Sequence, residues 1–397
     1  MKSKIAVIGQ GYVGLPLAIS AAEAGYRTFG IDLDLKKVEI IGAGKSTIED
    51  VSNDRVNKQI ESGNYSISND FALVSECKII VICVPTPLNS EQLPELSYIL
   101  QSAFEISKYL TPETLIILES TVAPGTTRNL LIPNLLKHSK LTIDQIDVAF
   151  SPERIDPMNS VWNLHSTPKI VSGLSERAKI KAIDFYSKFI KEIIECESLE
   201  IAETSKLLEN SFRLINISFI NEISMFCRKL GIDVNKVISA ASTKPYGFMP
   251  FFPSLGVGGH CIPVDPVYLS HKAKEIESNV SLIDLSLKIN LSVPNFFVKQ
   301  AEDKLGTLAN KKIIVLGVAY KSNISDYRET PVESLILGLR EKNAHVVWHD
   351  ELVKVWKNEK STPLSSDFDL AIIATPHDYF ELTKLGSVQV INTRESI

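Results

Sequence analysis

The chain has 397 residues, 44% of them hydrophobic and 22% charged, and a formal net charge of -5. It is too long for one compact core, so we expect a globular protein of two or three domains. The mild acidity and the lack of a strongly basic stretch argue against a nucleic-acid partner, although a few cations and helix N-termini can hold a small anionic ligand. No run of 18 apolar residues occurs, so we expect no transmembrane helix, no membrane partner and a cytoplasmic protein.

In the first half of the chain, short β-branched runs alternate with helical stretches. Runs that are apolar almost throughout suit a parallel sheet covered on both faces. The clearest predicted strands are Ile5–Ile8, Arg27–Ile31, Ile79–Val84, Thr114–Glu119, Asp147–Phe150 and Ile170–Ser172.

The middle of the chain is predicted to be helical. The stretch from about Ser198 to Leu230 has no Pro or Gly and repeats apolar residues at the helical period, and more helix is expected from Ser281 to Asp303. Between them, Thr243–Pro266 is rich in Gly, Pro and aromatic residues and has no period. This composition predicts a long ordered loop.

A second α/β unit is expected from Lys311 onward. KKIIVLGVAY is typical of a strand, and it is followed by a helix at Val332–Lys342 and by strands at His345–His349, Leu370–Ala374 and Val388–Asn392. The predicted fold class is therefore α/β, with two Rossmann-like, doubly wound parallel-sheet domains joined by a helical connector with a long central helix. The predicted domains are residues 1–195, 196–305 and 306–397.

The first predicted strand runs into a GxGxxG motif, Gly9-Gln10-Gly11-Tyr12-Val13-Gly14, which opens a predicted helix at about Leu15–Ala24. Gly9 permits the tight turn, Gly11 lets backbone amides approach a pyrophosphate, and Gly14 lets the helix pack against the strand. The next strand ends in Asp32, whose carboxylate would bind the ribose 2′-hydroxyl and repel a 2′-phosphate. The order strand, glycine turn, helix, strand and Asp favours NAD binding over NADP binding, and it favours a ligand site over a turn without a ligand. Asp34 is interpreted as a solvated charge.

Two further strands of the first half lead to hydroxyl residues. Ile79–Val84 is followed by Thr86, and Thr114–Glu119 by Ser120 and Thr121. Ligands of open parallel sheets bind beyond the carboxyl ends of strands, so Thr86 and Thr121 are candidate cofactor or substrate contacts. Each hydroxyl could equally cap the segment that follows it.

The five cysteines have no CxxC pair and no metal-ligand spacing, so neither a disulfide scaffold nor a metal site is expected. Four of them lie within strand or helix patterns and are interpreted as core residues: Cys77, Cys83, Cys196 and Cys227. Cys261 instead lies in GVGGHCIPVDP, at positions 256–266, directly after three glycines. Because glycines let the main chain approach a ligand closely, this sulfur could be presented at an exposed turn, with Asp265 four residues on.

The sequence resembles the UDP-glucose/GDP-mannose dehydrogenase family, and within it the branch that oxidises UDP-N-acetylhexosamines such as UDP-N-acetylglucosamine. The resemblance covers nearly the whole chain. It implies an NAD domain, a helical connector, a C-terminal domain for the nucleotide of a UDP-sugar, a homodimer or higher homo-oligomer built around the connector helix, and a place in polysaccharide biosynthesis. The motifs that carry it are the GxGxxG with Asp32, VPTP at 84–87, STVAPGTT at 120–127, SPER at 151–154, AETSKLLEN at 202–210, GVGGHCIPVDP at 256–266 and YKSNISDYRETP at 320–331.

Carried over motif by motif, the resemblance makes Cys261 the catalytic nucleophile, with Lys206, Asn210 and Asp265 as supporting residues. Thr121 and Glu153 would lie near the reacting carbon and its water. The resemblance also implies cofactor contacts from Tyr12, Val13, Thr86, Thr121 and Arg328, and substrate contacts from Glu153, Arg154, Lys206, Asn210, Phe251, Gly258 and Lys321.

Oxidising an alcohol to an acid takes two hydride transfers and passes through an aldehyde that must not escape. A thiolate that captures the aldehyde as a thiohemiacetal meets this need, because the adduct can be oxidised to a thioester that water cleaves. Lys206 and Asn210 are four residues apart, so one helical face presents an ammonium and an amide together. We expect Lys206 to stabilise the oxyanion, Asp265 to act as base through water, and Glu153, with Thr121, to position the hydrolytic water.

The choice of sugar is open at this point. Val264 fits the UDP-N-acetylhexosamine branch, and the stretch Lys244–Phe248 resembles its UDP-N-acetylglucosamine members, whereas Ser254-Leu255 and Asp156-Pro157-Met158 depart from the family pattern. UDP-glucose, UDP-N-acetylmannosamine and UDP-N-acetylgalactosamine are therefore alternatives. A single-step dehydrogenase of the 3-hydroxyacid type would have no use for Cys261, and a catalytically silent nucleotide-sugar-binding subunit would not need Cys261, Lys206 and Asp265 together.

Overall fold

The computed structural model describes residues 3–155, 159 and 161–395, and the chain forms two compact units. Unit 1 contains the residues up to Leu208 and the segment Val267–Glu275, and unit 2 contains Glu209–Pro266 and the residues from Ile276 onward. The chain changes unit three times: within α7 (Leu199–Leu230), near the start of α9 (Asp265–Glu275), and at the end of α9. The three-domain division expected from the sequence stays a prediction.

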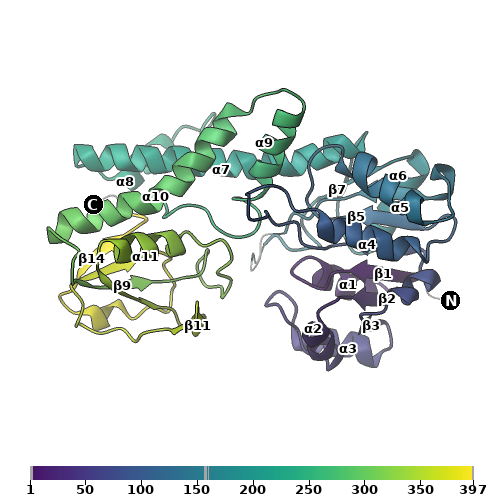
Figure 1. The fold of residues 1–397 in the computed structure, drawn as a ribbon, viewed down its shortest axis with the longest axis horizontal. Helices are drawn as coiled ribbons and strands as arrows, with labels where there is room; N and C mark the ends of the chain where they lie inside the picture. The colour runs from purple at the N-terminus through teal and green to yellow at the C-terminus, as the bar shows by residue number, and fades with distance from the viewer. Residues whose placement is uncertain (1–2, 156–158, 160, 396–397) are drawn as a thin grey trace. The chain divides into compact units, whose positions relative to one another are not determined.

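Unit 1 is built on an eight-stranded sheet with the order β3-β2-β1-β4-β5-β6-β7-β8 (Figure 1). Neighbouring strands run parallel, apart from the antiparallel pair β6–β7. The strands are β1 (Lys4–Ile8), β2 (Arg27–Ile31), β3 (Tyr65–Ser68), β4 (Ile79–Ile82), β5 (Leu115–Leu118), β6 (Asp147–Phe150), β7 (Lys169–Gly173) and β8 (Ile193–Glu195).

Alternate residues of the central strands enter two separate cores, one on each face of this sheet. On β1, Ile5 and Val7 pack with α1, α3 and α6, whereas Ala6 and Ile8 pack with α4 and α5. The four consecutive apolar residues Ile5–Ile8 of β1 therefore stabilise a sheet covered on both faces. The helices of this unit besides α7 and α9 are α1 (Gly14–Glu23), α2 (Leu35–Gly42), α3 (Asn53–Glu61), η1 (Phe71–Glu76), α4 (Ser97–Ser107), η2 (Thr127–Leu131), α5 (Ile132–His138), η3 (Ile143–Gln145) and α6 (Glu176–Tyr186).

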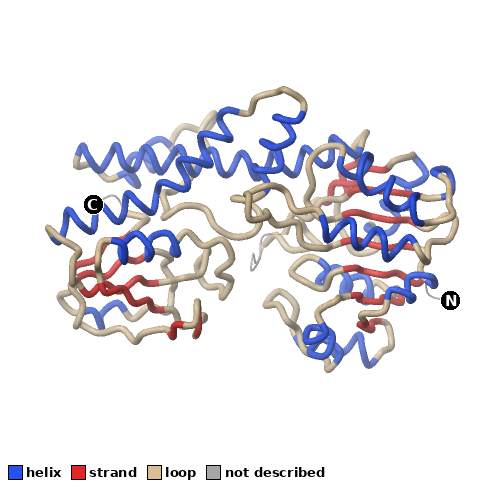
Figure 2. The backbone as a smooth tube through the Cα atoms, in the orientation of Figure 1, coloured by secondary structure: helices blue, strands red, loops and turns tan. Residues whose placement is uncertain are grey.

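Unit 2 contains a second, smaller parallel sheet with the order β10-β9-β13-β14, and a separate two-stranded antiparallel hairpin (Figure 2). Ile313 and Val315 of β9 face the core that includes α10 and α11, and Ile314 and Leu316 face the other side. The elements are α8 (Val234–Ala241), α10 (Ser281–Leu305), β9 (Lys312–Leu316), α11 (Val332–Glu341), β10 (His345–His349), β11 (Val355–Trp356), β12 (Glu359–Lys360), β13 (Leu370–Ile373), η4 (Leu382–Leu385) and β14 (Gln389–Asn392).

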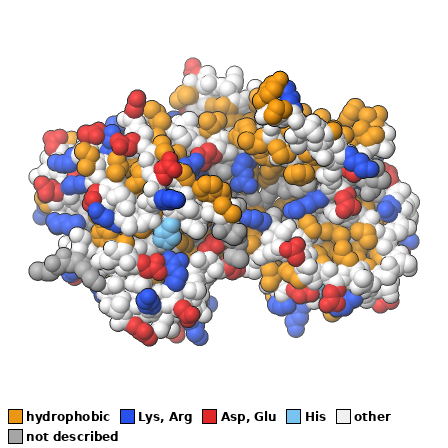
Figure 3. Space-filling view, turned by 180° about the vertical axis from the view of Figure 1, so that it is seen from behind, with side chains coloured by type: hydrophobic (Ala, Val, Ile, Leu, Met, Phe, Trp, Pro, Cys, Tyr) orange, Lys and Arg blue, Asp and Glu red, His pale blue; other side chains and the backbone are white. Residues whose placement is uncertain are grey.

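The fold class predicted from the sequence is confirmed, with two differences in detail. The prediction missed β3 and β8, which are short edge strands without a continuous apolar run and with Tyr65 as their one buried residue. The loop expected at Thr243–Pro266 ends two residues earlier, because α9 begins at Asp265. Among the described residues, no helix is long and apolar enough to cross a membrane. On the face shown in Figure 3, cationic and anionic side chains are interspersed.

Candidate functional site

The glycine turn after β1 has the backbone geometry that the motif predicts. Gly9 has a φ of +87°, and a Cβ there would lie 2.6 Å from the carbonyl oxygen of Cys83. A Cβ on Gly14 would lie 1.8 Å from the carbonyl oxygen of Gly9, so only glycine lets α1 start so close to the strand. A Cβ on Gly11 would meet no described atom within 4 Å, which leaves its backbone accessible to a ligand. Tyr12 and Val13 lie in the same turn and are half-buried.

Asp32 lies beside this turn at the end of β2. Its Oδ2 accepts a hydrogen bond from the backbone N–H of Gln10 at 2.8 Å. The same oxygen forms an ion pair with Lys37 Nζ at 2.8 Å. The side chain keeps 11% of its surface exposed, so it can reach a bound ribose. Asp34, interpreted from the sequence as a solvated charge, is exposed but has a structural role, because its side chain accepts from Lys36 N and Lys37 N and caps α2.

Thr86 and Thr121 both follow strands of the same sheet at their carboxyl ends. Thr86 is buried, and its carbonyl oxygen accepts from the hydroxyl of Tyr268 on α9 at 3.2 Å. Thr121 is half-buried beside Ser120, whose hydroxyl donates to the carbonyl oxygen of Val84 at 2.7 Å. The two loops after β4 and β5 are therefore joined to each other directly.

The SPER motif places Glu153 and Arg154 just beyond β6. Glu153 is buried and accepts from the backbone N–H of Ile155, and its Oε2 lies 3.9 Å from Nζ of the equally buried Lys206 on α7. Arg154 donates to the carbonyl oxygen of Pro168 at 2.7 Å. The fold thus brings Glu153 and Lys206, both predicted site residues, close together. The departure at Asp156-Pro157-Met158 lies outside the described residues.

One helical turn beyond Lys206, Asn210 of α7 contacts the aspartate of the cysteine loop. Its Nδ2 donates to Oδ2 of Asp265 at 2.5 Å, and both side chains are buried. The backbone N–H of Asp265 in turn donates to the carbonyl oxygen of Cys261 at 2.8 Å. Cys261 and Asp265 are therefore one turn apart, and the carboxylate is fixed by α7.

The glycines of the cysteine loop are needed because the loop packs closely on the segment Tyr320–Pro331. A Cβ on Gly258 would lie 2.8 Å from Glu329 O, and a Cβ on Gly259 would lie 2.9 Å from the ring of Tyr320. Gly259 N also donates to Arg328 O at 3.0 Å. Within unit 2, the main chain of this segment thus shapes the loop that carries Cys261.

The five cysteines differ in burial, and Cys196, predicted to be a core residue, is not buried. Cys77, Cys83 and Cys227 are buried, whereas Cys196 and Cys261 are partly exposed. Burial raises the pKa of Cys77 to about 12, that of Cys83 well above its ordinary value, and that of Cys196 more modestly. These thiols stay protonated near neutral pH, so they are poor nucleophiles.

Three further predicted residues lie in unit 2. Lys321 is half-buried, and the guanidinium of Arg328 donates to both carboxylate oxygens of Asp326 at 2.6 to 3.1 Å. Burial, together with the charge of Arg328, lowers the pKa of His260 below its ordinary value, so this neighbour of Cys261 stays neutral. Phe251 packs edge-on against Phe212 and on the apolar cluster between α7 and α8.

Three buried polar residues of the long helices hold the loops in place, and sequence reasoning assigned none of them this role. Glu203 of α7 accepts from Gly125 N and Thr127 N, and Asn290 of α10 accepts from Val257 N at 2.8 Å. Asn221 of α7 accepts from Ser254 N at 2.9 Å. The available signal was a polar residue within an otherwise apolar helical stripe.

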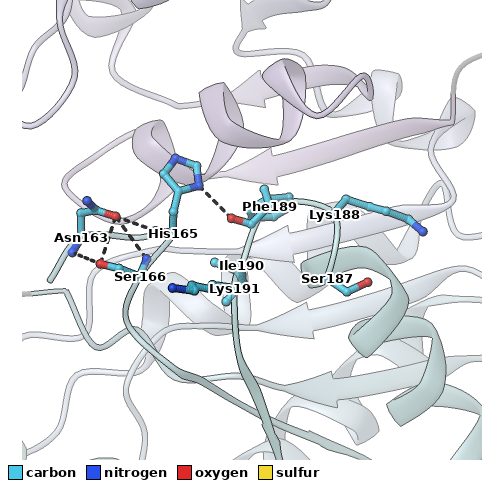
Figure 4. A pocket seen from close by; sticks show the side chains of 8 residues that line it. All are labelled: Asn163, His165, Ser166, Ser187, Lys188, Phe189, Ile190 and Lys191. Carbon is cyan, nitrogen blue, oxygen red and sulfur yellow. Dashed lines mark hydrogen bonds between the residues drawn. The ribbon is translucent and has the colours of Figure 1, made fainter.

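A shallow pocket on the surface of unit 1 lies elsewhere (Figure 4). Within it, the Nδ1 of His165 lies 2.7 Å from the carbonyl oxygen of Phe189, and Asn163 accepts from the backbone of His165 and Ser166. None of the predicted site residues is among its eight lining residues. Among the described residues, no group of three or more His, Cys, Asp and Glu side chains could hold a metal ion.

Comparisons with known proteins agree along the whole chain. Three domain models of the UDP-glucose/GDP-mannose dehydrogenase family match it: the NAD binding domain at residues 3–190, the central domain at 200–292 and the UDP binding domain at 314–396. A UDP-N-acetyl-D-glucosamine 6-dehydrogenase from Salmonella typhi is 31% identical, over 98% of this chain and 92% of that protein. A UDP-N-acetyl-D-mannosamine dehydrogenase from Pyrococcus horikoshii is 32% identical, over 97% and 92%. The solved structure of a UDP-D-ManNAc dehydrogenase from that organism superimposes with a TM-score of 0.91 at 30% identity, over 99% of this chain and 96% of that one.

Proposed function

This chain belongs to the UDP-glucose/GDP-mannose dehydrogenase family, and from that membership we propose that it oxidises the C6 alcohol of UDP-N-acetylglucosamine to the uronate, with Cys261 as covalent anchor. It is an NAD-dependent nucleotide-sugar dehydrogenase, and its substrate is a UDP-sugar. The identity of the sugar and the covalent chemistry are the parts that need a test.

Relatives of nearly equal identity act on different sugars, so identity alone does not choose between them. Relatives named for UDP-N-acetylglucosamine and for UDP-N-acetylmannosamine are 31% and 32% identical to this chain. The glucosamine sugar is favoured by the stretch Lys244–Phe248, which resembles the substrate-covering stretch of that branch. Tyr246 in this stretch is 71% exposed, and Nζ of Lys244 lies 4.9 Å from its ring centre.

The turn after β1 fits the cofactor. The left-handed φ of Gly9 and the accessible backbone of Gly11 suit a pyrophosphate, and the position of Asp32 beside this turn supports a role in binding the ribose hydroxyls. NAD, when bound, accepts one hydride in each of the two oxidations. A negative charge at Asp32 disfavours a 2′-phosphate, which supports NAD rather than NADP.

The proposed chemistry gives each polar residue a step. A base removes the proton of the C6 hydroxyl as the hydride leaves, and we assign this to Asp265 through water. The thiolate of Cys261 then adds to the aldehyde carbon, and loss of a second hydride converts the thiohemiacetal to a thioester. Lys206 and Asn210 stabilise the oxyanions. Glu153, with Thr121, positions the water that releases the acid.

We further propose that the chain works as a homodimer or a higher homo-oligomer. Phe212, Phe219 and Phe226 of α7 are 44%, 56% and 59% exposed, and they follow one another at seven-residue spacing. Such a stripe of large apolar side chains on one helix face favours packing against another helix. Light scattering of the purified chain tests this assignment.

The observation that carries the proposed function is the buried bond between Asn210 and Asp265, because it fixes the base one turn from the sulfur of Cys261. The test is NADH release from UDP-N-acetylglucosamine, its galacto and manno epimers, UDP-glucose and GDP-mannose. We expect two NADH per sugar with UDP-N-acetylglucosamine, and a fall of roughly a thousandfold in kcat for Cys261→Ser, because an alkoxide is a poorer leaving group than a thiolate. One NADH per sugar would indicate a single-step dehydrogenase, and none with any sugar would indicate a silent binding subunit.

A further inference from the structure

A buried ion pair in unit 1 has no role in the chemistry described so far. Nζ of Lys169 lies 2.9 Å from Oε2 of Glu119, and the two side chains are 5% and 1% exposed. The hydroxyl of Tyr186 donates to the other oxygen of Glu119. Removing two charges from water costs several kcal/mol per ion, so an apolar pair would serve stability as well or better. The position of the pair is therefore the informative feature.

The ion pair joins two loops of the candidate site. Glu119 directly follows β5 and precedes Ser120 and Thr121, whereas Lys169 is the first residue of β7. Nζ of Lys169 also donates to the carbonyl oxygen of Pro152 at 3.3 Å, one residue before Glu153. A single ammonium thus links the end of β5 to the turn that carries Glu153.

The partners around this ammonium have fixed hydrogen-bonding roles. Burial and the neighbouring Glu119 charge raise the pKa of Tyr186 far above its ordinary value, so its hydroxyl remains a donor. Nζ of Lys169 lies 5.0 Å from the centre of the Tyr186 ring, which favours the cation. On the other side of the turn, the hydroxyl of Ser151 donates to Ile170 O at 2.7 Å. The turn is therefore fixed at two consecutive residues, Ser151 and Pro152.

We propose that Glu119 and Lys169 are positioning residues for the hydrolytic step, because they set the Pro152-Glu153 turn and with it the Glu153 carboxylate. This inference rests on the proposed function. In that step, the water oxygen bonds to C6 of the thioester, one water proton passes to Glu153, and the C6–Sγ bond breaks to release the Cys261 thiolate. Lys169 acts on this step only through the carbonyl of Pro152 and through Glu119. Both hydride transfers precede the hydrolytic step.

A residue for a matched control lies in the same sheet, at the amino end of β6. Asp147, the first residue of β6, is fully buried and pairs with Arg177 at 2.8 Å and Lys181 at 2.7 Å. It is thus a buried carboxylate with cationic partners at the amino end of a strand, away from the Glu153 turn. Asp147→Asn removes a comparable charge without a link to the hydrolytic residues.

The test is a stopped-flow record of NADH together with mass spectrometry of Cys261 in the full-length protein. The double variant Glu119→Gln/Lys169→Met, which leaves no unpaired buried charge, should retain a burst of two NADH per active site at a rate within threefold of the parent. Its steady-state kcat should fall by a factor of 10 to 100, and a sugar thioester should accumulate on Cys261. Lys169→Arg, which keeps the cation and guards against misfolding of the double variant, should slow the steady state about fivefold with the burst intact.

Several outcomes would overturn this assignment. The first is an equal fall in the burst rate and in the steady-state kcat of the double variant. The second is an unchanged steady-state kcat in Lys169→Arg. The third is the same accumulation of thioester in Asp147→Asn. Glu153→Gln separates the two levels of the argument. If Glu153→Gln accumulates thioester but the ion-pair variants do not, only the positioning role fails. If Glu153→Gln accumulates none, the proposed role of Glu153 in hydrolysis fails.

Discussion

The first strand of each sheet leads into the same backbone arrangement, although the two sequences differ. In unit 1, Gly9 N donates to Ile31 O at 2.7 Å, and the next N–H donates to Asp32 at 2.8 Å. In unit 2, Gly317 N donates to His349 O at 2.9 Å, and the next N–H donates to Asp350 at 3.0 Å. In both, an aspartate directly after the neighbouring strand holds the turn.

The two turn glycines are also equivalent in conformation. Their φ angles are +87° at Gly9 and +81° at Gly317. A Cβ on Gly9 would collide with the carbonyl oxygen of Cys83, after β4, and one on Gly317 with that of Thr375, after β13. In both sheets that neighbouring strand lies on the opposite side of the first strand from the aspartate.

The two aspartates differ in what surrounds them. Asp32 is partly exposed and pairs with Lys37, whereas Asp350 is fully buried, with its Oδ2 3.3 Å from His377 Nε2 and its Oδ1 3.1 Å from the Tyr379 hydroxyl. Unit 2 also has buried Ala319 where the motif of unit 1 has Gly11, and no helix begins at that turn. The two turns therefore share a backbone geometry but differ in the exposure of the acid and in the residue at the third position, Gly11 or Ala319.

The largest expected effect follows from the burial of Asp350. Asp350→Asn should lower the free energy of unfolding of unit 2 by about 3 kcal/mol, because the amide leaves buried donors without a charged acceptor. Trp348 and Trp356 are buried in unit 2, so their fluorescence during urea unfolding reports this loss. Asp32→Asn should change the same transition by less than about 0.5 kcal/mol. Equal losses in the two variants would contradict the contrast between them.

A smaller effect is expected from pH. Burial alone would raise the pKa of Asp350, but the hydrogen bonds from His377 and from the amides of Val353 and Val318 together lower it to about 2. A carboxyl whose pKa is lowered on folding contributes stability that is present above its unfolded pKa, about 3.9, and is lost as the pH falls toward 2. The shift corresponds to about 2 kcal/mol.

The measurement is the difference in unfolding free energy between the parent and Asp350→Asn at pH 5, 3.5 and 2.5. Because other carboxyls titrate in both proteins, this difference isolates Asp350. It should shrink by about 2 kcal/mol across the range. A constant difference would mean that hydrogen bonding without charge accounts for the role of Asp350.

How far the sequence predicts this molecule depends on how local each feature is. The turn from Gly9 to Gly14 and its partner Asp32 were predicted together, because strand, turn and helix follow each other directly. The strand His345–His349 was also predicted, yet no role was given to Asp350, because the turn after Gly317 lacks the second glycine that marks a ligand site. The burial that distinguishes the two acids depends on His377 and Tyr379, which lie on a distant loop.

The candidate site shows the same limit. Motifs named Asn210 and Asp265 separately, but their hydrogen bond joins residues 55 positions apart. Glu119 was predicted to end a strand and Lys169 to precede one, and nothing in their local pattern indicates that the two charges meet. Chemistry that depends on one turn or one loop could be predicted from the sequence. The pairing of charges that are distant in the sequence could be seen only in the folded structure.

The final prediction concerns cofactor choice at Asp32. Lys37 Nζ lies 2.8 Å from Asp32 Oδ2, so the acid that we propose to bind the ribose hydroxyls is also paired with a cation. In Asp32→Ser this ammonium is released beside the position of the 2′-hydroxyl, where it can pair with a 2′-phosphate. We expect NAD to bind about tenfold more weakly and 2′,5′-ADP to bind about tenfold more tightly than in the parent, which is about 1.4 kcal/mol each.

Calorimetry with 2′,5′-ADP and with NAD measures both changes without relying on turnover. The double variant Asp32→Ser/Lys37→Ala should lose the gain in 2′,5′-ADP binding but keep the loss in NAD binding. Asp34→Asn is the matched control, since it alters an exposed acid two residues away whose side chain caps α2 by accepting from Lys36 N and Lys37 N. If Asp32→Ser gains phosphate binding equally well without Lys37, the acid acts by repulsion alone, and its ion pair with Lys37 has no part in choosing the cofactor.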